Sequence, residues 1–204
     1  RANANKLMGR FLYGLKKKAD YAVISLAGGQ KDNAITRECI TEFLTDAPEE
    51  VKAYAKELQE QIREEYTGSD ENITIEVKEN GVETAQVLHP TSQEKIVFYL
   101  QNVPFGIQKM SGTIKGLVES SSNIGILRLD EDELFASSSV RSSVDAACSA
   151  ISDKIEYLTE FLGGDYEVQG AYPAWEYRKD SPLRDKMVEI FEEMYGHKIG
   201  RASC

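Results

Sequence analysis

The chain has 204 residues, with 24 Lys and Arg against 34 Asp and Glu, which gives a formal net charge of −10. This acidic balance argues against binding to nucleic acid, because phosphate binding depends on clustered basic side chains. With 41% hydrophobic and 28% charged residues, the composition is typical of a folded globular protein, and no stretch approaches the ~20 apolar residues of a membrane span. We therefore expect a cytoplasmic protein with neither a nucleic-acid nor a membrane partner.

The first half of the chain alternates helical and extended patterns. Apolar residues at helical spacing predict a helix over residues 3–18, and a strand over residues 21–26 ends at Gly28 and Gly29. A second strand over residues 35–44 would form an antiparallel hairpin with the first. A helix then starts near Asp46, with a buried stripe that repeats at helical spacing, and a strand over residues 73–77 follows.

The same order of elements recurs in the second half. We predict a helix over residues 92–100, strands over residues 123–129 and 134–140, a helix from Val144 and a strand over residues 166–169. One more strand before an α-β-β-α-β unit makes it a ferredoxin-like βαββαβ module, and residues 83–88 would supply that strand in the second copy. The predicted fold class is α+β, with two tandem ferredoxin-like modules that form one antiparallel sheet with helices on one face. The open face of that sheet would need a cover.

Residues 1–170 are expected to form one domain with two related halves, about 1–80 and 81–170. After Gly170 the character of the sequence changes, with two prolines and the sole tryptophan, Trp175. A final helix is predicted from Ser181 and Pro182 to a Gly196 C-cap. Because no partner for this helix is apparent in the duplicated unit, residues 171–204 are assigned to a different domain.

Side chains that could carry catalysis or bind a metal are scarce. The glycines form no phosphate-binding loop, and His89 and His197 have no metal ligand at suitable spacing. The three cysteines, Cys39, Cys148 and Cys204, match neither a disulfide framework nor a zinc motif. The serine-rich stretches lack a neighbouring base. We assign no catalytic residue and no metal ligand to this chain.

Two polar positions remain as candidate binding residues. Asn33 lies at the predicted start of the second strand, and Arg141 ends the corresponding hairpin of the second half. An amide can donate to a carbonyl or to an oxyanion that develops on it, and arginine can hold a carboxylate bidentately. The alternatives are a turn residue at Asn33 and a salt bridge at Arg141.

Five stretches carry a resemblance to a known family. They are "RANANKLMGRFL", "GGQKDNAITRE", "GIQKMSGTIKGLVESSSNIGIL", "SSVRSSVDAACSAI" and "QGAYPAWEYRKDSPL". In this order they resemble the lid-domain segment of bacterial aminoacyl-histidine dipeptidases, which are carnosinase-like zinc metallopeptidases. The resemblance extends from Arg1 to about Lys198.

The resemblance implies substrate-binding roles for the two candidates. Asn33 would help to hold the scissile carbonyl and its tetrahedral oxyanion, and Arg141 would bind the C-terminal carboxylate of a dipeptide. Two zinc ions would be bound by the catalytic domain of the parent enzyme and none by this chain, so the chain alone is expected to be inactive. A homodimer through the sheet edge or the helices is a further expected partner, besides the catalytic domain itself.

The sequence also departs from the family pattern. Thr36 stands where the family usually has proline, which implies a mild change to the turn. A substrate-contacting histidine of the lid would lie just upstream of Arg1, and the last residues, 199–204, do not continue as the family does.

The sequence therefore supports two hypotheses. The first is the lid of a cytosolic zinc dipeptidase that acts on Xaa-His dipeptides. The alternative is a non-catalytic tandem ferredoxin-like module that binds small ligands or a protein.

Overall fold

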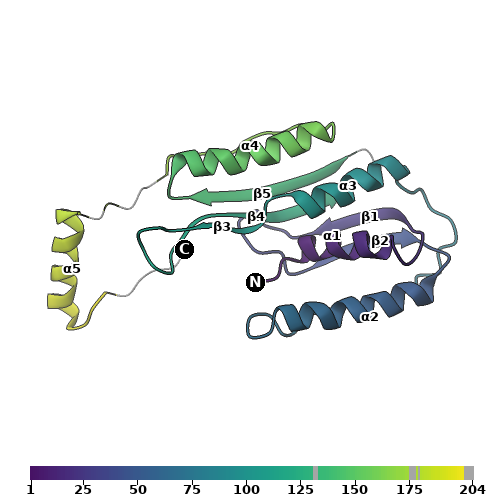
Figure 1. Ribbon diagram of the computed structural model, residues 1–204, viewed down its shortest axis with the longest axis horizontal. Helices are drawn as coiled ribbons and strands as arrows, with labels where there is room; N and C mark the ends of the chain where they lie inside the picture. The colour runs from purple at the N-terminus through teal and green to yellow at the C-terminus, as the bar shows by residue number, and fades with distance from the viewer. Residues whose placement is uncertain (131–132, 175–177, 179, 200–204) are drawn as a thin grey trace.

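The computed structural model describes residues 1–130, 133–174, 178 and 180–199. Helices and strands alternate along these residues (Figure 1). In chain order the elements are α1 (Ala4–Leu15), β1 (Ala22–Gly28), β2 (Cys39–Leu44), α2 (Pro48–Glu65), α3 (Pro90–Asn102), β3 (Gly106–Met110), β4 (Val118–Leu129), β5 (Leu134–Ser142), α4 (Asp145–Phe161) and α5 (Pro182–Tyr195). Among the described helices, none is both long and apolar enough to span a membrane.

The strands form one antiparallel sheet around β4, which is the longest strand. β5 pairs with β4 along nearly its whole length, from Ser120 opposite Ser142 to Leu129 opposite Leu134. The other edge of β4 is shared, because β3 pairs with residues 118–122 and β1 pairs only with residues 127–128. β1 and β3 therefore lie in line along one edge of β4, and residues 123–126 fall in the gap between them.

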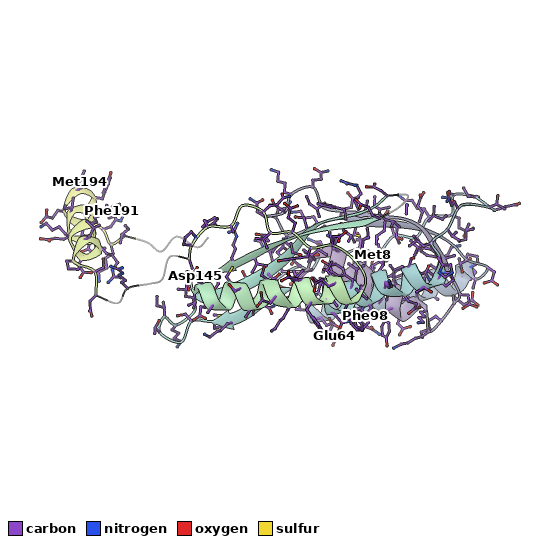
Figure 2. The ribbon with its side chains drawn as sticks, turned by 90° about the horizontal axis from the view of Figure 1, so that it is seen from above. Met8, Glu64, Phe98, Asp145, Phe191 and Met194 are labelled. Carbon is purple, nitrogen blue, oxygen red and sulfur yellow. The ribbon has the colours of Figure 1, made fainter. Side chains whose placement is uncertain are left out.

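One face of the sheet carries helices α1 to α4, and Figure 2 shows helices on one side of the strands, with α5 apart from them. Along β4, Ser120, Ser122 and Ile124 are buried towards these helices, while Ser121 and Asn123 alternate to the opposite side and are only partly buried. We call this opposite side the open face. It is the face on which side chains are available to a ligand or to another domain.

The core consists of two hydrophobic clusters, the first mainly from the first half of the chain and the second mainly from the second half. The first joins α1, α2 and β1, and it contains the full apolar stripe predicted for α2. The second joins α3 and α4 to β4. The buried members are Phe11, Leu12, Leu15, Val23, Val51, Tyr54, Ala55, Leu58, Ile62 and Val97 in the first cluster, and Leu26, Ile96, Tyr99, Leu100, Val103, Ile124, Leu127, Ile151 and Ile155 in the second.

The predicted fold class is confirmed: the chain is α+β, with an antiparallel sheet and helices on one face. A helix, a β-hairpin and a second helix occur in each half, as α1-β1-β2-α2 and as α3-β4-β5-α4 with β3 inserted. This arrangement is consistent with two tandem ferredoxin-like modules.

Three predicted strands, over residues 73–77, 83–88 and 166–169, were wrong, since these residues form no strand. Residues 73–77 instead run against α2, where the backbone groups of Ile73 and Ile75 bond to side chains. The Arg63 Nε donates to the Ile73 carbonyl at 2.7 Å, and the Ile75 N–H donates to Gln59 Oε1 at 2.7 Å. Side chains of α2 thus take the place of a neighbouring strand.

Two further differences concern the hairpins. β3 was not predicted, because its sequence GIQKM is short and four of its five residues are exposed. β2 begins only at Cys39, and not at residue 35. Residues before it are drawn away from the hairpin by a bond from the Ala4 N–H to the Thr36 carbonyl at 2.9 Å.

The final helix has the predicted caps. The Ser181 hydroxyl accepts a hydrogen bond from the Arg184 N–H at 3.3 Å, and Gly196 ends α5 with a φ of 70°. No residue of α5 is buried, although Leu183, Met187 and Met194 form an apolar set along it. Trp175 lies outside the described residues, as do residues 200–204, whose origin the sequence left open.

Candidate functional site

Asn33 lies in the connection between β1 and β2, well before β2 begins at Cys39. The prediction that it starts the strand is therefore wrong. Its side chain is exposed, and its backbone N–H donates to the Asp32 carboxylate at 2.8 Å. Within the described part of the chain no hydrogen bond engages its side-chain amide. That amide is available to a ligand.

Arg141 is the penultimate residue of β5 and pairs with Ser121 of β4. Its position at the end of the second hairpin is therefore as predicted. The side chain is exposed, and no ion pair or hydrogen bond among the described residues involves its guanidinium. The salt-bridge alternative thus has no partner in this part of the chain.

The loop that carries Asn33 is bonded to Asn123, which shares a face of the sheet with Arg141. Asn123 follows Ser121 by two positions on β4, so both side chains project to the open face, as does Arg141 opposite Ser121. Asn123 Nδ2 donates to the Asp32 carbonyl at 3.3 Å and to the Ala34 carbonyl at 2.8 Å. The loop that carries Asn33 therefore rests beside the part of β4 that pairs with Arg141.

Buried polar side chains fill the gap that β1 and β3 leave along the edge of β4. Asn3 and Asn5 are fully buried and Thr36 is 4% exposed. Asn3 Nδ2 donates to the Ile124 carbonyl at 2.9 Å, and Thr36 Oγ1 donates to the Gly125 carbonyl at 2.9 Å. These bonds satisfy carbonyls that have no neighbouring strand on that edge.

The same side chains also bond to one another. Asn3 Nδ2 donates to Asn123 Oδ1 at 3.0 Å, and Asn5 Nδ2 donates to Thr36 Oγ1 at 3.2 Å. We call Asn3, Asn5, Thr36 and Asn123 the edge network. It links the N-terminus, the Asn33 loop and the middle of β4.

Glycines allow the Asn33 loop to lie directly on β4. A Cβ at Gly125 would approach the Asp32 carbonyl oxygen to 2.3 Å, and a Cβ at Gly29 would approach the Gly125 carbonyl oxygen to 1.8 Å. Gly29 also has a φ of 77°, which side-chain-bearing residues rarely adopt. Gly29, which precedes the loop, and Gly125, on β4, therefore allow close contact between the two backbones.

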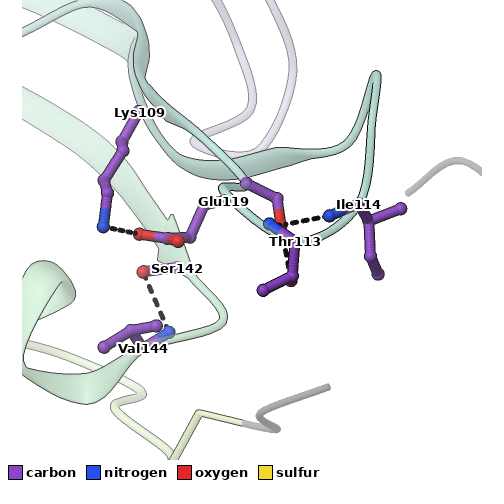
Figure 3. A network of polar contacts seen from close by, with 7 residues as sticks. Lys109, Thr113, Ile114, Glu119, Ser142 and Val144 are labelled. Carbon is purple, nitrogen blue, oxygen red and sulfur yellow. Dashed lines mark hydrogen bonds and ion pairs between the residues drawn. The ribbon is translucent and has the colours of Figure 1, made fainter. Parts of the chain in front are cut away.

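An ion pair between Lys109 and Glu119 lies beside Ser142, the residue that follows Arg141 on β5 (Figure 3). Lys109 Nζ lies 2.7 Å from Glu119 Oε1, and the Glu119 side chain is only 11% exposed. Glu119 is two positions from Ser121 on β4, so it faces the same side as Arg141. Lys109 therefore offsets the negative charge of this largely buried carboxylate.

No group of three or more His, Cys, Asp or Glu among the described residues could hold a metal ion. His89 instead caps α3, where its Nδ1 accepts a hydrogen bond from the Thr91 N–H at 3.2 Å. The ring of His197 packs edge-on against the ring of Phe191. Cys39 is partly buried, and burial raises the pKa of its thiol to about 12, so this thiol stays protonated.

Sequence reasoning missed Asn3, Asn5 and Asn123. The available signal was an asparagine at Asn3, just before the helical pattern begins, which is typical of an N-cap. The Lys6 N–H does donate to Asn3 Oδ1 at 3.2 Å. The other side-chain hydrogen bonds of Asn3 join residues about 120 positions apart, as with Ile124 at a separation of 121. No local sequence pattern predicts such bonds.

Comparison with known proteins relates this chain to part of known peptide hydrolases, although no protein-family model matches it. The chain is homologous to a segment of bacterial dipeptidases. This finding confirms the resemblance inferred from the sequence.

Two relatives define the similarity. The cytosol non-specific dipeptidase of Escherichia coli K12 is 26% identical over 195 residues, which are 95% of this chain and 40% of that protein. The crystal structure of aminoacylhistidine dipeptidase from Vibrio alginolyticus superposes with a TM-score of 0.87 and 30% identity, over 97% of this chain and 41% of that one. The chain thus spans about two fifths of the length of these relatives.

Proposed function

We propose that this chain is the lid domain of a cytosolic zinc dipeptidase that hydrolyses Xaa-His dipeptides. The observation that carries the proposal is the match of 97% of the chain, with a TM-score of 0.87, to part of an aminoacylhistidine dipeptidase. Two exposed polar side chains support a role in binding substrate: Arg141 on the open face, and Asn33 in the loop that is bonded to Asn123, both without partners in the described part of the chain.

Each of the two residues has a distinct task in this proposal. The Asn33 amide donates a hydrogen bond to the scissile carbonyl, and this bond strengthens as negative charge develops on the oxygen. The Arg141 guanidinium holds the C-terminal carboxylate of the dipeptide, and its planar fork suits two parallel N–H···O bonds. Arg141 therefore acts mainly on substrate affinity, and Asn33 acts mainly on the rate of the chemical step.

The zinc ions implied by the family do not fit the described residues of this chain, which contain no cluster of metal ligands. The proposal therefore assigns metal binding to a separate catalytic domain and gives this chain substrate contacts only. Alone, the chain would bind no zinc and hydrolyse no peptide. Its expected partners are the catalytic domain, the dipeptide and a second copy of the protein in a homodimer.

We further propose that residues 1–170 form the lid and that residues 171–204 return the chain to the catalytic domain. The exposed apolar side chains of α5, including Leu183 at 73% and Met194 at 70%, are consistent with a helix that packs on that domain. The cytoplasmic assignment rests on the Escherichia coli relative, which is a cytosol dipeptidase.

The test uses the full-length dipeptidase that the proposal implies, with alanyl-histidine and its C-terminal amide as substrates. Arg141→Ala should raise KM for the free acid, because a charge-assisted contact of about 1.5–3 kcal/mol is lost. The amide has no carboxylate, so its KM should change little. The measurement is kcat and KM for both substrates.

Arg128→Ala is the matched control, since Arg128 is an exposed arginine of the same sheet that pairs with Asp130. It should leave the preference for the free acid unchanged. If Arg141→Ala also leaves that preference unchanged, the carboxylate role is wrong. Tight, metal-independent binding of alanyl-histidine to the isolated chain in calorimetry would favour the alternative, a non-catalytic binding module.

A further inference from the structure

Asn123 holds the backbone on both sides of Asn33. Its Nδ2 donates to the carbonyls of Asp32 and Ala34, at 3.3 and 2.8 Å. We propose that Asn123 is a positioning residue that fixes the Asn33 amide over the open face of β4. This inference rests on the proposed function and adds a residue to it, because Asn123 itself would not touch the substrate.

The orientation of the Asn123 amide follows from its neighbour. Asn3 Oδ1 accepts the Lys6 N–H at 3.2 Å, and Asn3 Nδ2 donates to the Ile124 carbonyl at 2.9 Å, so the Asn3 amide has one consistent orientation. Its Nδ2 then requires an acceptor in Asn123, which is Oδ1 at 3.0 Å. Asn123 must therefore direct Nδ2 towards the loop. The two loop carbonyls are acceptors, so they need the N–H groups of Nδ2 as donors.

The loop depends on such support because Asn33 makes few contacts of its own. Its side chain is exposed, and among the described residues its backbone N–H bonds to the adjacent residue, Asp32. An amide that stabilises a developing oxyanion must be held close to its working position, and a displacement of about 1 Å costs roughly 100-fold in rate. Asn123, on a strand, supplies a rigid point of attachment.

The position of Asn123 also relates Asn33 to Arg141. Asn123 and Ser121 are successive residues on the open face of β4, and Ser121 pairs with Arg141. The spacing between the oxyanion donor and the carboxylate-binding residue is therefore set by one strand. A dipeptide has a fixed distance between its scissile carbonyl and its C-terminal carboxylate. The spacing between Asn33 and Arg141 therefore helps to determine the length of peptide that can bind.

The experiment uses the full-length dipeptidase and the variant Asn123→Asp, which keeps the shape of the side chain and removes the donor. We expect kcat for alanyl-histidine to fall about 10- to 100-fold with KM changed less than about 3-fold. The preference for the free acid over the amide, which reports on Arg141, should be retained. Asn123→Ser is the second variant, for use if the aspartate variant does not fold.

A double-mutant cycle with Asn33→Ala separates positioning from general loss of structure. If Asn123 acts through Asn33, Asn123→Asp should have little further effect once Asn33 is alanine. Hydrogen exchange of peptides covering residues 29–36 should accelerate in Asn123→Asp, with the rest of the protein unchanged. Thr41→Val is the control, because it removes a side-chain bond of 2.9 Å to the Ser25 carbonyl outside the loop.

The two proposals fail in different ways. An Asn33→Ala enzyme with normal kcat would overturn the role of Asn33 in the proposed function. A large loss of kcat in Asn33→Ala together with normal kcat in Asn123→Asp would overturn only the positioning role. A loss in Asn123→Asp that persists undiminished in the Asn33→Ala background would likewise exclude action through Asn33.

Discussion

The side chain of Asn3 donates to that of Asn123 at 3.0 Å across a separation of 120 residues. The bond joins the start of the first helix to the middle of the central strand. Since Asn3 is fully buried, its polar groups depend on protein partners for their hydrogen bonds. The stability of the whole sheet should therefore respond to changes in the edge network.

Asn3→Ala should lower the free energy of unfolding by about 1–3 kcal/mol, because buried partners lose their hydrogen bonds. The Ile124 carbonyl and the Lys6 N–H would both be left without the Asn3 side chain. Urea unfolding of the chain measures this loss. Asn102→Ala, which removes an exposed side-chain bond to the Phe98 carbonyl, should stay within about 0.5 kcal/mol of the wild type. If both variants lose the same free energy of unfolding, the edge network stabilises the fold no more than an exposed hydrogen bond does.

Thr36→Val should destabilise the chain by about 1–3 kcal/mol although the shape of the side chain is retained. The hydroxyl both donates to the Gly125 carbonyl and accepts from Asn5 Nδ2. Thr45→Val is the control, because the Thr45 hydroxyl also both donates and accepts, to the Asp20 carbonyl at an exposed site and from the Ala47 N–H at a partly buried one. Thermal unfolding of the variants measures the difference. A Thr36→Val protein as stable as the control would show that the hydroxyl contributes nothing.

Gly125→Ala should displace the loop that carries Asn33. The new Cβ would lie 2.3 Å from the Asp32 carbonyl oxygen and 2.5 Å from that of Lys31, so backbone must move. Hydrogen exchange in residues 29–36 should increase, and the unfolding midpoint in urea should fall. Gly112→Ala has open space around its Cβ and should behave as the wild type. Unchanged exchange in Gly125→Ala would contradict the direct contact between loop and strand.

The thiol of Cys39 should make stability depend on pH in alkaline solution. Burial raises its pKa to about 12 from 9.0, so between these values the folded chain holds a proton that the unfolded chain releases. Stability from this group is therefore present below pH 9.0 and is lost as the pH rises towards about 12. Urea unfolding at pH 8 and pH 10 should show a larger loss in the wild type than in Cys39→Ala. Other titrating groups are common to both proteins, so equal losses would exclude Cys39 as the cause.

Local patterns in the sequence predicted the helices well. The stripe from Val51 to Ile62 on α2 is buried as expected, because one helical period places all its members on one side. Ser181, Pro182 and Gly196 marked the ends of α5, since capping depends only on nearby backbone groups. Such signals depend on residues that are close together in the sequence, so they can be recognised without the structure.

The misplaced strands depend on contacts that the sequence does not display. Residues 73–77 have the alternation of a strand, yet their backbone bonds to Arg63 and Gln59 of α2. β2 starts late because Thr36 is bonded to Ala4 and Gly125. For the candidate site, the choice of Asn33 and Arg141 was possible from their place at the hairpins, whereas the supporting role of Asn123 required knowledge of which strand lies beneath the loop.

The gap along β4 has a consequence for association between molecules. Backbone carbonyls at residues 124–125 face an interval between β1 and β3 where neither strand pairs with them. A free stretch of strand edge is a template for the strand of another molecule, and such edges promote strand exchange and aggregation. Asn3, Asn5 and Thr36 occupy this stretch with side-chain hydrogen bonds. These side chains therefore block the unpaired stretch, and a variant without the side chains of Asn3, Asn5 and Thr36 would expose a strand edge in the middle of its own sheet.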